Sequence, residues 1–360
     1  MENLERKSRS VRWMVIGFIL CLISGFGVQA IQTSAGDIRM DNMTFQSSEG
    51  NKLSGYLFVP PNATSETPAP AIVTVHGWYN SKEMQDAFYV ELARRGYVVL
   101  SLDMNSHGNS EQLDGDHLYD GALGVHDAVT QLATMDFVDK EQIGLTGHSS
   151  GGGASNMAIQ LDNERDEPLI AANMLQAADW KDEFEEDVSD AYGSRSVGII
   201  ADRYDSFYFW FYDDDGELTS VPRDFIGSDQ ARWFLGFGED SSAFSGTPEA
   251  GKYYTKTIDG VETQRVIYTP NITHAMVPFS MTASSEVVDF FDSVFGAPNP
   301  IPSSDQIWPW KTAFNLLGLI GFFTLMTAAM IAFTRTRFFA EVSVGRVSEP
   351  RPAPRGAGRG

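Results

Sequence analysis

The stretch "GLTGHSSGGGA" at residues 144–154 decides the fold. Within it Gly147, Ser149 and Gly151 fit the pattern G-x-S-x-G, in which a serine stands on a sharp turn between a strand and a helix. Five residues with three fixed positions also recur by chance, so the flanking sequence has to decide. An apolar run ends at Gly147, and further glycines at 152 and 153 let a helix start close to the strand. We therefore predict a strand–turn–helix elbow with Ser149 as the candidate nucleophile.

Strand-like and helix-like segments alternate on both sides of this elbow, which is typical of an α/β fold with a mostly parallel central sheet flanked by helices. The length of 360 residues suits one large α/β domain, predicted over residues 31–295, together with terminal appendages. The predicted strands are 53–60, 71–77, 97–103, 142–147, 171–179, 196–202 and 263–270, and the predicted helices are 84–96, 121–135, 152–162 and 284–296.

Two apolar stretches lie near the ends of the chain. The first, residues 13–30, follows four basic residues and is predicted to be a signal peptide or signal anchor, with removal at Ala30 and retention both open. The second, residues 312–334, has 23 residues without a charge and is predicted to be a transmembrane helix. Residues 296–311 are the predicted linker, and the Pro/Gly/Arg-rich residues 335–360 the predicted tail. Basic residues beside both stretches predict cytoplasmic termini and an extracytoplasmic middle segment at the cell membrane.

The segment 31–310 is strongly acidic. It contains 15 of the 26 Lys and Arg residues but 44 of the 48 Asp and Glu residues, a net charge of −29. Such a charge argues against nucleic acid and anionic lipid headgroups as partners of this segment. Cys21, the only cysteine, falls in the first apolar stretch, so the middle segment has neither a disulfide nor a thiol nucleophile.

A serine nucleophile needs N–H donors for the oxyanion that its attack creates. We expect one from the backbone of Ser150 and the other from the loop "VHGWYN" (75–80), at Trp78. Candidate residues of the substrate pocket are Trp78, Tyr79, His148 and Phe207. A run of six aromatic residues begins at Phe207, and three roles are open for it: lining an acyl pocket, facing the bilayer or packing on the sheet.

The serine also needs a general base. Of the six histidines, only His274 follows the last predicted strand, where the chain returns to the mouth of the sheet. The acid that orients His274 should lie between Ser149 and His274, and Asp179, Asp202 and Asp205 all stand at strand ends. We prefer Asp205, and the other two remain alternatives.

The segments "VTVHGW", "SLDMNSHGNS", "VDKEQIGLTGHSSGG", "VGIIADRYD" and "YTPNITHA" together resemble the α/β-hydrolase superfamily, near its dienelactone-hydrolase-like and esterase-like members. The resemblance covers about residues 43–295. It implies a Ser149–Asp205–His274 triad, no metal or organic cofactor, and hydrolysis of an ester, thioester or amide of a small molecule. Dienelactone hydrolases use a cysteine, which is absent at this position. Residues 206–262 are also longer than such connections usually are, and we expect any cover over the site to come from them.

The expected protein is therefore a membrane-anchored extracytoplasmic serine hydrolase acting on carboxylic esters or related acyl compounds, with the lipid bilayer as the partner of the apolar segments. A catalytically silent binding domain on the same fold is the alternative from another class, because a fold does not fix a function. A peptidase is the third possibility.

Overall fold

The computed structural model describes residues 2–213 and 215–339. The described residues form two compact units. One unit is Ala30–Pro309, and the other combines residues 2–29 with residues 310–339. From residue 340 onward, the predicted tail lies outside the described residues.

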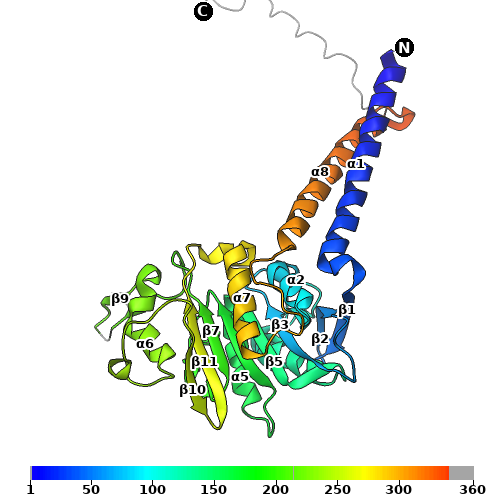
Figure 1. Ribbon diagram of the computed structural model, residues 1–360. Helices are drawn as coiled ribbons and strands as arrows, with labels where there is room; N and C mark the ends of the chain where they lie inside the picture. Colours follow the sequence, from blue (N-terminus) through cyan, green and yellow to red (C-terminus); the bar gives the residue numbers. More distant parts are fainter. Residues whose placement is uncertain (1, 214, 340–360) are drawn as a thin grey trace, which may run out of the picture. The chain divides into compact units, whose positions relative to one another are not determined.

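A nine-stranded sheet forms the centre of the unit Ala30–Pro309 (Figure 1). The strand order is β1-β2-β4-β3-β5-β6-β7-β11-β10. Neighbours from β4 to β11 are parallel, while β1, β2 and β10 add antiparallel edges. The strands are β1 (Arg39–Gln46), β2 (Lys52–Val59), β3 (Ala69–Val75), β4 (Val98–Asp103), β5 (Val138–His148), β6 (Ile170–Gln176), β7 (Ser196–Ile200), β10 (Tyr254–Ile258) and β11 (Val261–Tyr268), with a separate pair β8 (Phe211–Tyr212) and β9 (Leu218–Ser220). The predicted fold, an α/β fold with a mostly parallel sheet, is confirmed.

Helices cover both faces of this sheet (Figure 1). One face carries α2 and α7, whose apolar residues share a buried cluster, and the other carries α4 and α5. Every residue of β3 is buried, because a parallel strand between two helical layers meets apolar side chains on both faces. The α-helices of this unit are α2 (Asp86–Arg94), α3 (Asp120–Leu123), α4 (Val125–Ala133), α5 (Ser150–Asp162), α6 (Asp229–Leu235) and α7 (Met281–Val294). The short 3-10 helices of the described chain are η1 (Ser34–Gly36), η2 (Lys82–Gln85), η3 (Gly115–Tyr119), η4 (Ser189–Tyr192), η5 (Pro222–Gly227), η6 (Ser241–Ala243), η7 (His274–Phe279) and η8 (Arg337–Phe339).

The two edge strands β1 and β10 were not among the predicted strands. Most of their residues are exposed or half-buried, so neither strand carries the apolar run that marks the inner strands. Each pairs in a hairpin with the next strand along the chain, β1 with β2 and β10 with β11. The two-residue turn Asp259–Gly260 between β10 and β11 is a local hairpin signal that the prediction overlooked.

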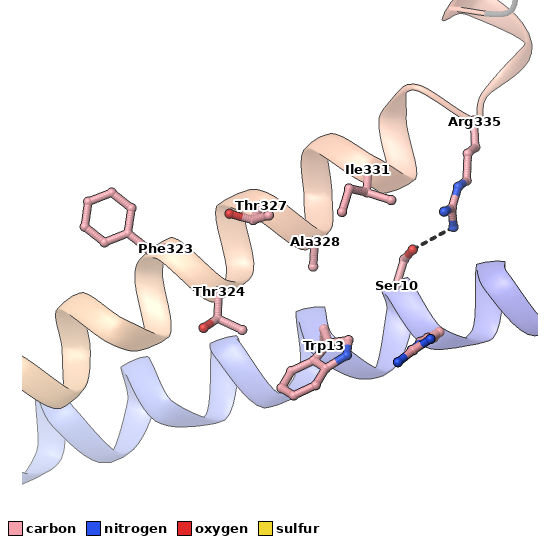
Figure 2. A pocket seen from close by; sticks show the side chains of 9 residues that line it. Ser10, Trp13, Phe323, Thr324, Thr327, Ala328, Ile331 and Arg335 are labelled. Atoms are coloured by element: carbon pink, nitrogen blue, oxygen red, sulfur yellow. Dashed lines mark hydrogen bonds between the residues drawn. The ribbon is translucent and has the colours of Figure 1, made fainter. Parts of the chain in front are cut away.

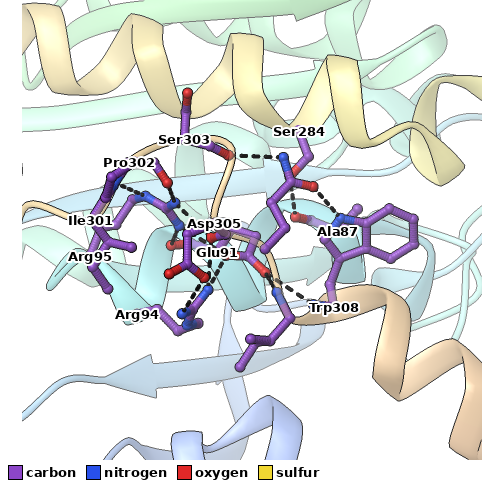
Figure 3. Close-up of polar contacts among 12 residues, drawn as sticks. Ala87, Glu91, Arg94, Arg95, Ser284, Ile301, Pro302, Ser303, Asp305 and Trp308 are labelled. Carbon is purple, nitrogen blue, oxygen red and sulfur yellow. Dashed lines mark hydrogen bonds and ion pairs between the residues drawn. The ribbon is translucent and has the colours of Figure 1, made fainter.

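Much of the predicted linker 296–311 is hydrogen-bonded to α2 and to Arg95 at its end (Figure 3). The guanidinium of Arg95 is fully buried and donates to the carbonyl of Ile301 at 3.0 Å and to the carboxylate of Glu91 at 2.9 Å. Glu91 accepts in turn from the backbone N–H of Ile307 at 2.7 Å. A buried ion pair is stable only when added hydrogen bonds satisfy its remaining donors and acceptors. The backbone of the linker supplies these bonds to Arg95 and Glu91, and the same bonds fix the linker against α2.

The second unit contains two long apolar helices, α1 (Glu2–Gln32) and α8 (Trp308–Phe333). Within them Arg9–Gln32 and Trp308–Phe333 are long and apolar enough to cross a membrane. A helix of this composition near an N-terminus is also typical of a signal sequence, so length and composition alone are weak evidence for a span.

Helices α1 and α8 contact each other in an antiparallel arrangement (Figure 2). At one end, the Arg335 guanidinium donates to the Ser10 hydroxyl at 2.9 Å. Further along, a Cβ added to Gly321 would come within 2.8 Å of the Leu20 Cβ and 2.9 Å of the Cys21 backbone nitrogen. Small residues let helix backbones approach this closely.

Candidate active site

Ser149 stands on a strained turn between β5 and α5. Its backbone has φ 55° and ψ −124°, which is unusual for a residue other than glycine. A Cβ at Gly147 would collide with the backbone of Gly151, and one at Gly151 would lie 2.6 Å from the carbonyl oxygen of His76. Only glycine fits at both positions, so the glycines of the motif allow α5 to start directly above the strand end. Strain of this kind places a serine hydroxyl above the edge of the sheet.

The loop after β3 packs directly against this elbow. A Cβ at Gly77 would lie 3.3 Å from the Ser149 Cβ. The His76 Nε2 accepts from the Met104 N–H at 3.2 Å, so its Nδ1 carries the hydrogen and donates to the Gly77 carbonyl at 2.8 Å. Burial lowers the pKa of His76 to about 4, which keeps the ring neutral.

This histidine determines the orientation of the expected oxyanion donor at Trp78. In a trans peptide the carbonyl and the next N–H point in opposite directions, so a Gly77 carbonyl held by His76 turns the Trp78 N–H away from His76. In the described chain, neither the Trp78 N–H nor the Ser150 N–H has a hydrogen-bond acceptor. Both predicted donors are thus free to bind an oxyanion.

Asp205 and His274 are in direct contact. The Asp205 Oδ2 accepts from the His274 Nδ1 at 2.8 Å, and the Asp205 side chain is fully buried. The other carboxylate oxygen accepts from the backbone N–H groups of Phe207 at 2.6 Å and Tyr208 at 2.7 Å. A carboxylate held in this way fixes the tautomer of the histidine and leaves the Nε2 as a base.

The other two candidate acids do not reach His274. Asp179 lies at the cavity wall, where its carboxylate accepts from the Lys181 backbone N–H at 3.1 Å, and burial raises its pKa to about 6. Asp202 is fully buried, and burial together with the charge of Asp205 raises its pKa to about 8. The structure therefore pairs Asp205 with the histidine.

His148, predicted in the pocket, also contacts His274. Its Nε2 donates to the backbone carbonyl of His274 at 3.0 Å. Burial lowers the pKa of His148 to about 4, so the ring stays neutral. We infer that this bond holds the backbone from which the His274 ring projects.

The Tyr208 side chain lies near the hydroxyl of Ser149 on the wall of the same cavity. The Tyr208 ring stacks on the His274 ring at 5.8 Å with an interplanar angle of 7°. Among the described residues no hydrogen bond joins Ser149 to His274, although both line the same cavity. Such bonds are often long or misaligned in a site without substrate.

A cavity of about 890 Å³ opens over Ser149. All four predicted pocket residues line it: Trp78, Tyr79, His148 and Phe207. Sequence reasoning missed other residues of its wall: Lys181, Asp182, Glu183, Glu185, Tyr208 and Phe279. In the sequence, Lys181 to Glu185 belong to an acidic run with the composition of a solvated surface, so no local signal marked them.

The wall around the cavity comes from two segments. We expected the cover from residues 206–262, and five of the residues from 207 to 212, all except Phe211, do line the cavity. Five of the residues from 179 to 185, all except Trp180 and Phe184, line it as well, since β6 ends beside β5 at the same edge of the sheet. The aromatic run is divided between two of the three roles considered: Phe207 and Tyr208 face His274, while Phe209 is buried against Phe225.

Comparisons with known proteins match the first part of the unit Ala30–Pro309 to a family. Residues 29–176 match the family described as "Esterase FrsA-like", and this range includes both the 75–80 loop and the elbow. The chain has the α/β-hydrolase fold. The family match covers less than half of the chain.

Individual relatives also match only part of the chain. It is similar to the non-heme chloroperoxidase of Burkholderia pyrrocinia, 34% identical over 96 residues, and to the thiohydrolase aneE of Aspergillus aculeatus, 30% identical over 148 residues. The matches span 27% and 40% of this chain and only 33% and 44% of those relatives. Among solved structures, it is similar to a hyperthermophilic esterase of the archaeon Pyrobaculum calidifontis, with a TM-score of 0.48 and 15% identity over 83% of this chain and 95% of that one.

Among the described residues, no group of three or more His, Cys, Asp or Glu side chains is arranged to hold a metal ion. What the site does contain is a strained serine, two free N–H donors and a histidine held by a carboxylate, all at one edge of the sheet. This set suits attack on an acyl carbon.

Proposed function

We propose that this α/β-hydrolase is a serine hydrolase that cleaves carboxylic esters or related acyl bonds through a Ser149–Asp205–His274 triad and an acyl-enzyme intermediate. The observation that carries the proposal is the 2.8 Å contact between Asp205 and His274, at the wall of the cavity that also contains Ser149. Similarity to an esterase family supports the reaction class.

In the first half of the reaction, the His274 Nε2 takes the proton of the Ser149 hydroxyl as the oxygen attacks the acyl carbon. The N–H groups of Trp78 and Ser150 receive the oxyanion. Buried Asp205 stabilises the imidazolium that forms. His274 then returns the proton to the leaving alcohol, and a water activated by the same ring releases the acid.

Labelling with a fluorophosphonate probe tests this proposal directly. We expect the full chain to be labelled, and Ser149→Ala to lose both the label and the hydrolysis of a short p-nitrophenyl ester. Ser150→Ala is the matched control, because it removes the neighbouring hydroxyl but keeps the backbone N–H. A silent binding domain would leave the wild type unlabelled. A peptidase would be labelled and would also cleave a peptide substrate, which an esterase would leave intact.

We also propose that α1 and α8 both stay in the membrane, with Ala30–Pro309 on the extracytoplasmic side. The close contacts of Gly321 with Leu20 and Cys21 support retention of α1, because a cleaved signal peptide would leave that face of α8 empty. Protease added to intact cells should then digest the catalytic unit and spare tags at both ends of the chain. Loss of an N-terminal tag from the mature protein would mean that α1 is removed.

A further inference from the structure

We propose that Glu183 is a specificity-determining residue: with the exposed aromatic rings of the cavity it selects esters that carry a positively charged group close to the scissile bond. This inference rests on the proposed hydrolase function and names the substrate class of that same site.

Glu183 lies beside the side chains of both residues that supply the expected oxyanion donors. Its Oε2 accepts from the Ser150 hydroxyl at 3.1 Å, and the Trp78 side chain lies near enough to the carboxyl group to lower its pKa. Gly153 leaves the room for it, because a Cβ at that position would collide with the Glu183 carboxylate. The carboxylate is thus held beside the site where the substrate acyl oxygen would lie.

The negative charge of Glu183 has no basic partner in the described structure. Four carboxylates line the cavity: Asp179, Asp182, Glu183 and Glu185. Histidines aside, Lys181 is the one basic residue on the described wall, and its ammonium group pairs with Glu185 at 3.1 Å. Burial, with a smaller contribution from the charges of Asp182 and Glu185, raises the pKa of Glu183 to about 7. Above that pH the cavity contains an unpaired anion next to the reacting bond.

An anion in this position discriminates between substrates. It opposes the negative charge that develops on the acyl oxygen, which disfavours the transition state of a neutral ester. A positively charged group on the substrate cancels that repulsion and neutralises the carboxylate. The transition state of the cationic ester is therefore stabilised relative to that of the neutral ester, and this difference is the selectivity.

The aromatic rings of the cavity suit the same class of substrate. Phe207 and Tyr212 on the wall are 73% and 60% exposed, and Trp78 is 36% exposed. Exposed ring faces attract ammonium groups, and quaternary ammonium groups most typically. A neutral acyl compound would make apolar contacts with these rings but no cation–π interaction.

A pair of esters with the same shape and different charge tests the inference. We suggest acetylcholine and its uncharged carbon isostere, 3,3-dimethylbutyl acetate, with the full chain in detergent at pH 8. For the wild type we expect kcat/KM to be about tenfold higher for acetylcholine, the size of one favourable charge contact. In Glu183→Gln, which keeps the shape of the side chain and leaves the aromatic rings in place, this ratio should fall several-fold.

Glu186→Gln is the control, since it removes the same charge from an exposed residue of the same segment that does not line the cavity. The ratio of the two esters is insensitive to a general loss of activity, and fluorophosphonate labelling of Glu183→Gln verifies that its site is folded. A wild-type ratio of one or less, an unchanged ratio in Glu183→Gln, or a labelled wild type that hydrolyses neither ester would overturn the inference. An unlabelled wild type that hydrolyses neither ester would instead contradict the proposed hydrolase function.

Discussion

Replacing Asp205 with asparagine tests how the buried carboxylate acts on His274. Asparagine can keep one part of the present geometry, because its amide oxygen can accept from the N–H groups of Phe207 and Tyr208. Its NH₂ group then faces the His274 Nδ1, which must become an acceptor. The hydrogen moves to the Nε2, so the ring meets Ser149 as a donor and is no longer a base.

The expected loss in kcat is about four orders of magnitude, which corresponds to about 5.5 kcal/mol of transition-state stabilisation. The Asp205 side chain is fully buried, so water does not screen its interaction with the imidazolium as it screens a surface pair. The KM should change little, because Asp205 does not line the cavity. The melting temperature should also stay nearly constant, because the two backbone hydrogen bonds survive.

The assay is steady-state hydrolysis of a short p-nitrophenyl ester at neutral pH, with thermal unfolding followed by circular dichroism. Asp179→Asn and Asp202→Asn are the controls, and each should retain more than about a tenth of the wild-type kcat. Asp202→Asn is a particularly close match, because a carboxyl group with a pKa of about 8 is already mostly neutral at pH 7. If Asp205→Asn stayed active while Asp179→Asn lost activity, Asp205 would not be the acid that orients His274.

Three further predictions concern other parts of the structure. His76→Leu should lower kcat about a hundredfold with little change in KM, because it leaves the Gly77 carbonyl with only the 3.3 Å bond from the Asn80 N–H and so loosens the orientation of the Trp78 N–H; a normal kcat would exclude this role. Because the pKa of Asp202 is about 8 in the folded protein and about 4 in the unfolded chain, its contribution to stability is complete below about pH 4 and is lost as the pH rises through about 8. In denaturant titrations between pH 5 and 9, the unfolding free energy of Asp202→Asn should therefore fall less than that of the wild type. Parallel curves would contradict this. Gly321→Leu should separate α1 from α8, measured as loss of crosslinking between cysteines placed in the two helices, whereas Gly25→Leu should not, because Gly25 has open space around it.

The local sequence was enough to predict the fold class and to identify Ser149 as the candidate nucleophile. The elbow around Ser149 is contiguous, and its glycines serve a turn only a few residues long. The inner strands are predictable because a parallel strand buried on both faces is a continuous apolar run, and the two apolar helices are predictable because their length and lack of charge are local properties. His274 followed from its place after the last strand.

The side-chain partners were decided only by the tertiary structure. Asp179, Asp202 and Asp205 all follow strand ends, and only the course of the chain after β7 brings the Asp205 carboxylate to His274. Glu183 belongs to an acidic run, and its position between Trp78 and Ser150 depends on β6 ending beside β5. Hydrogen bonds and charges act over a few ångströms in space, and residues that close together can be separated by any length of chain.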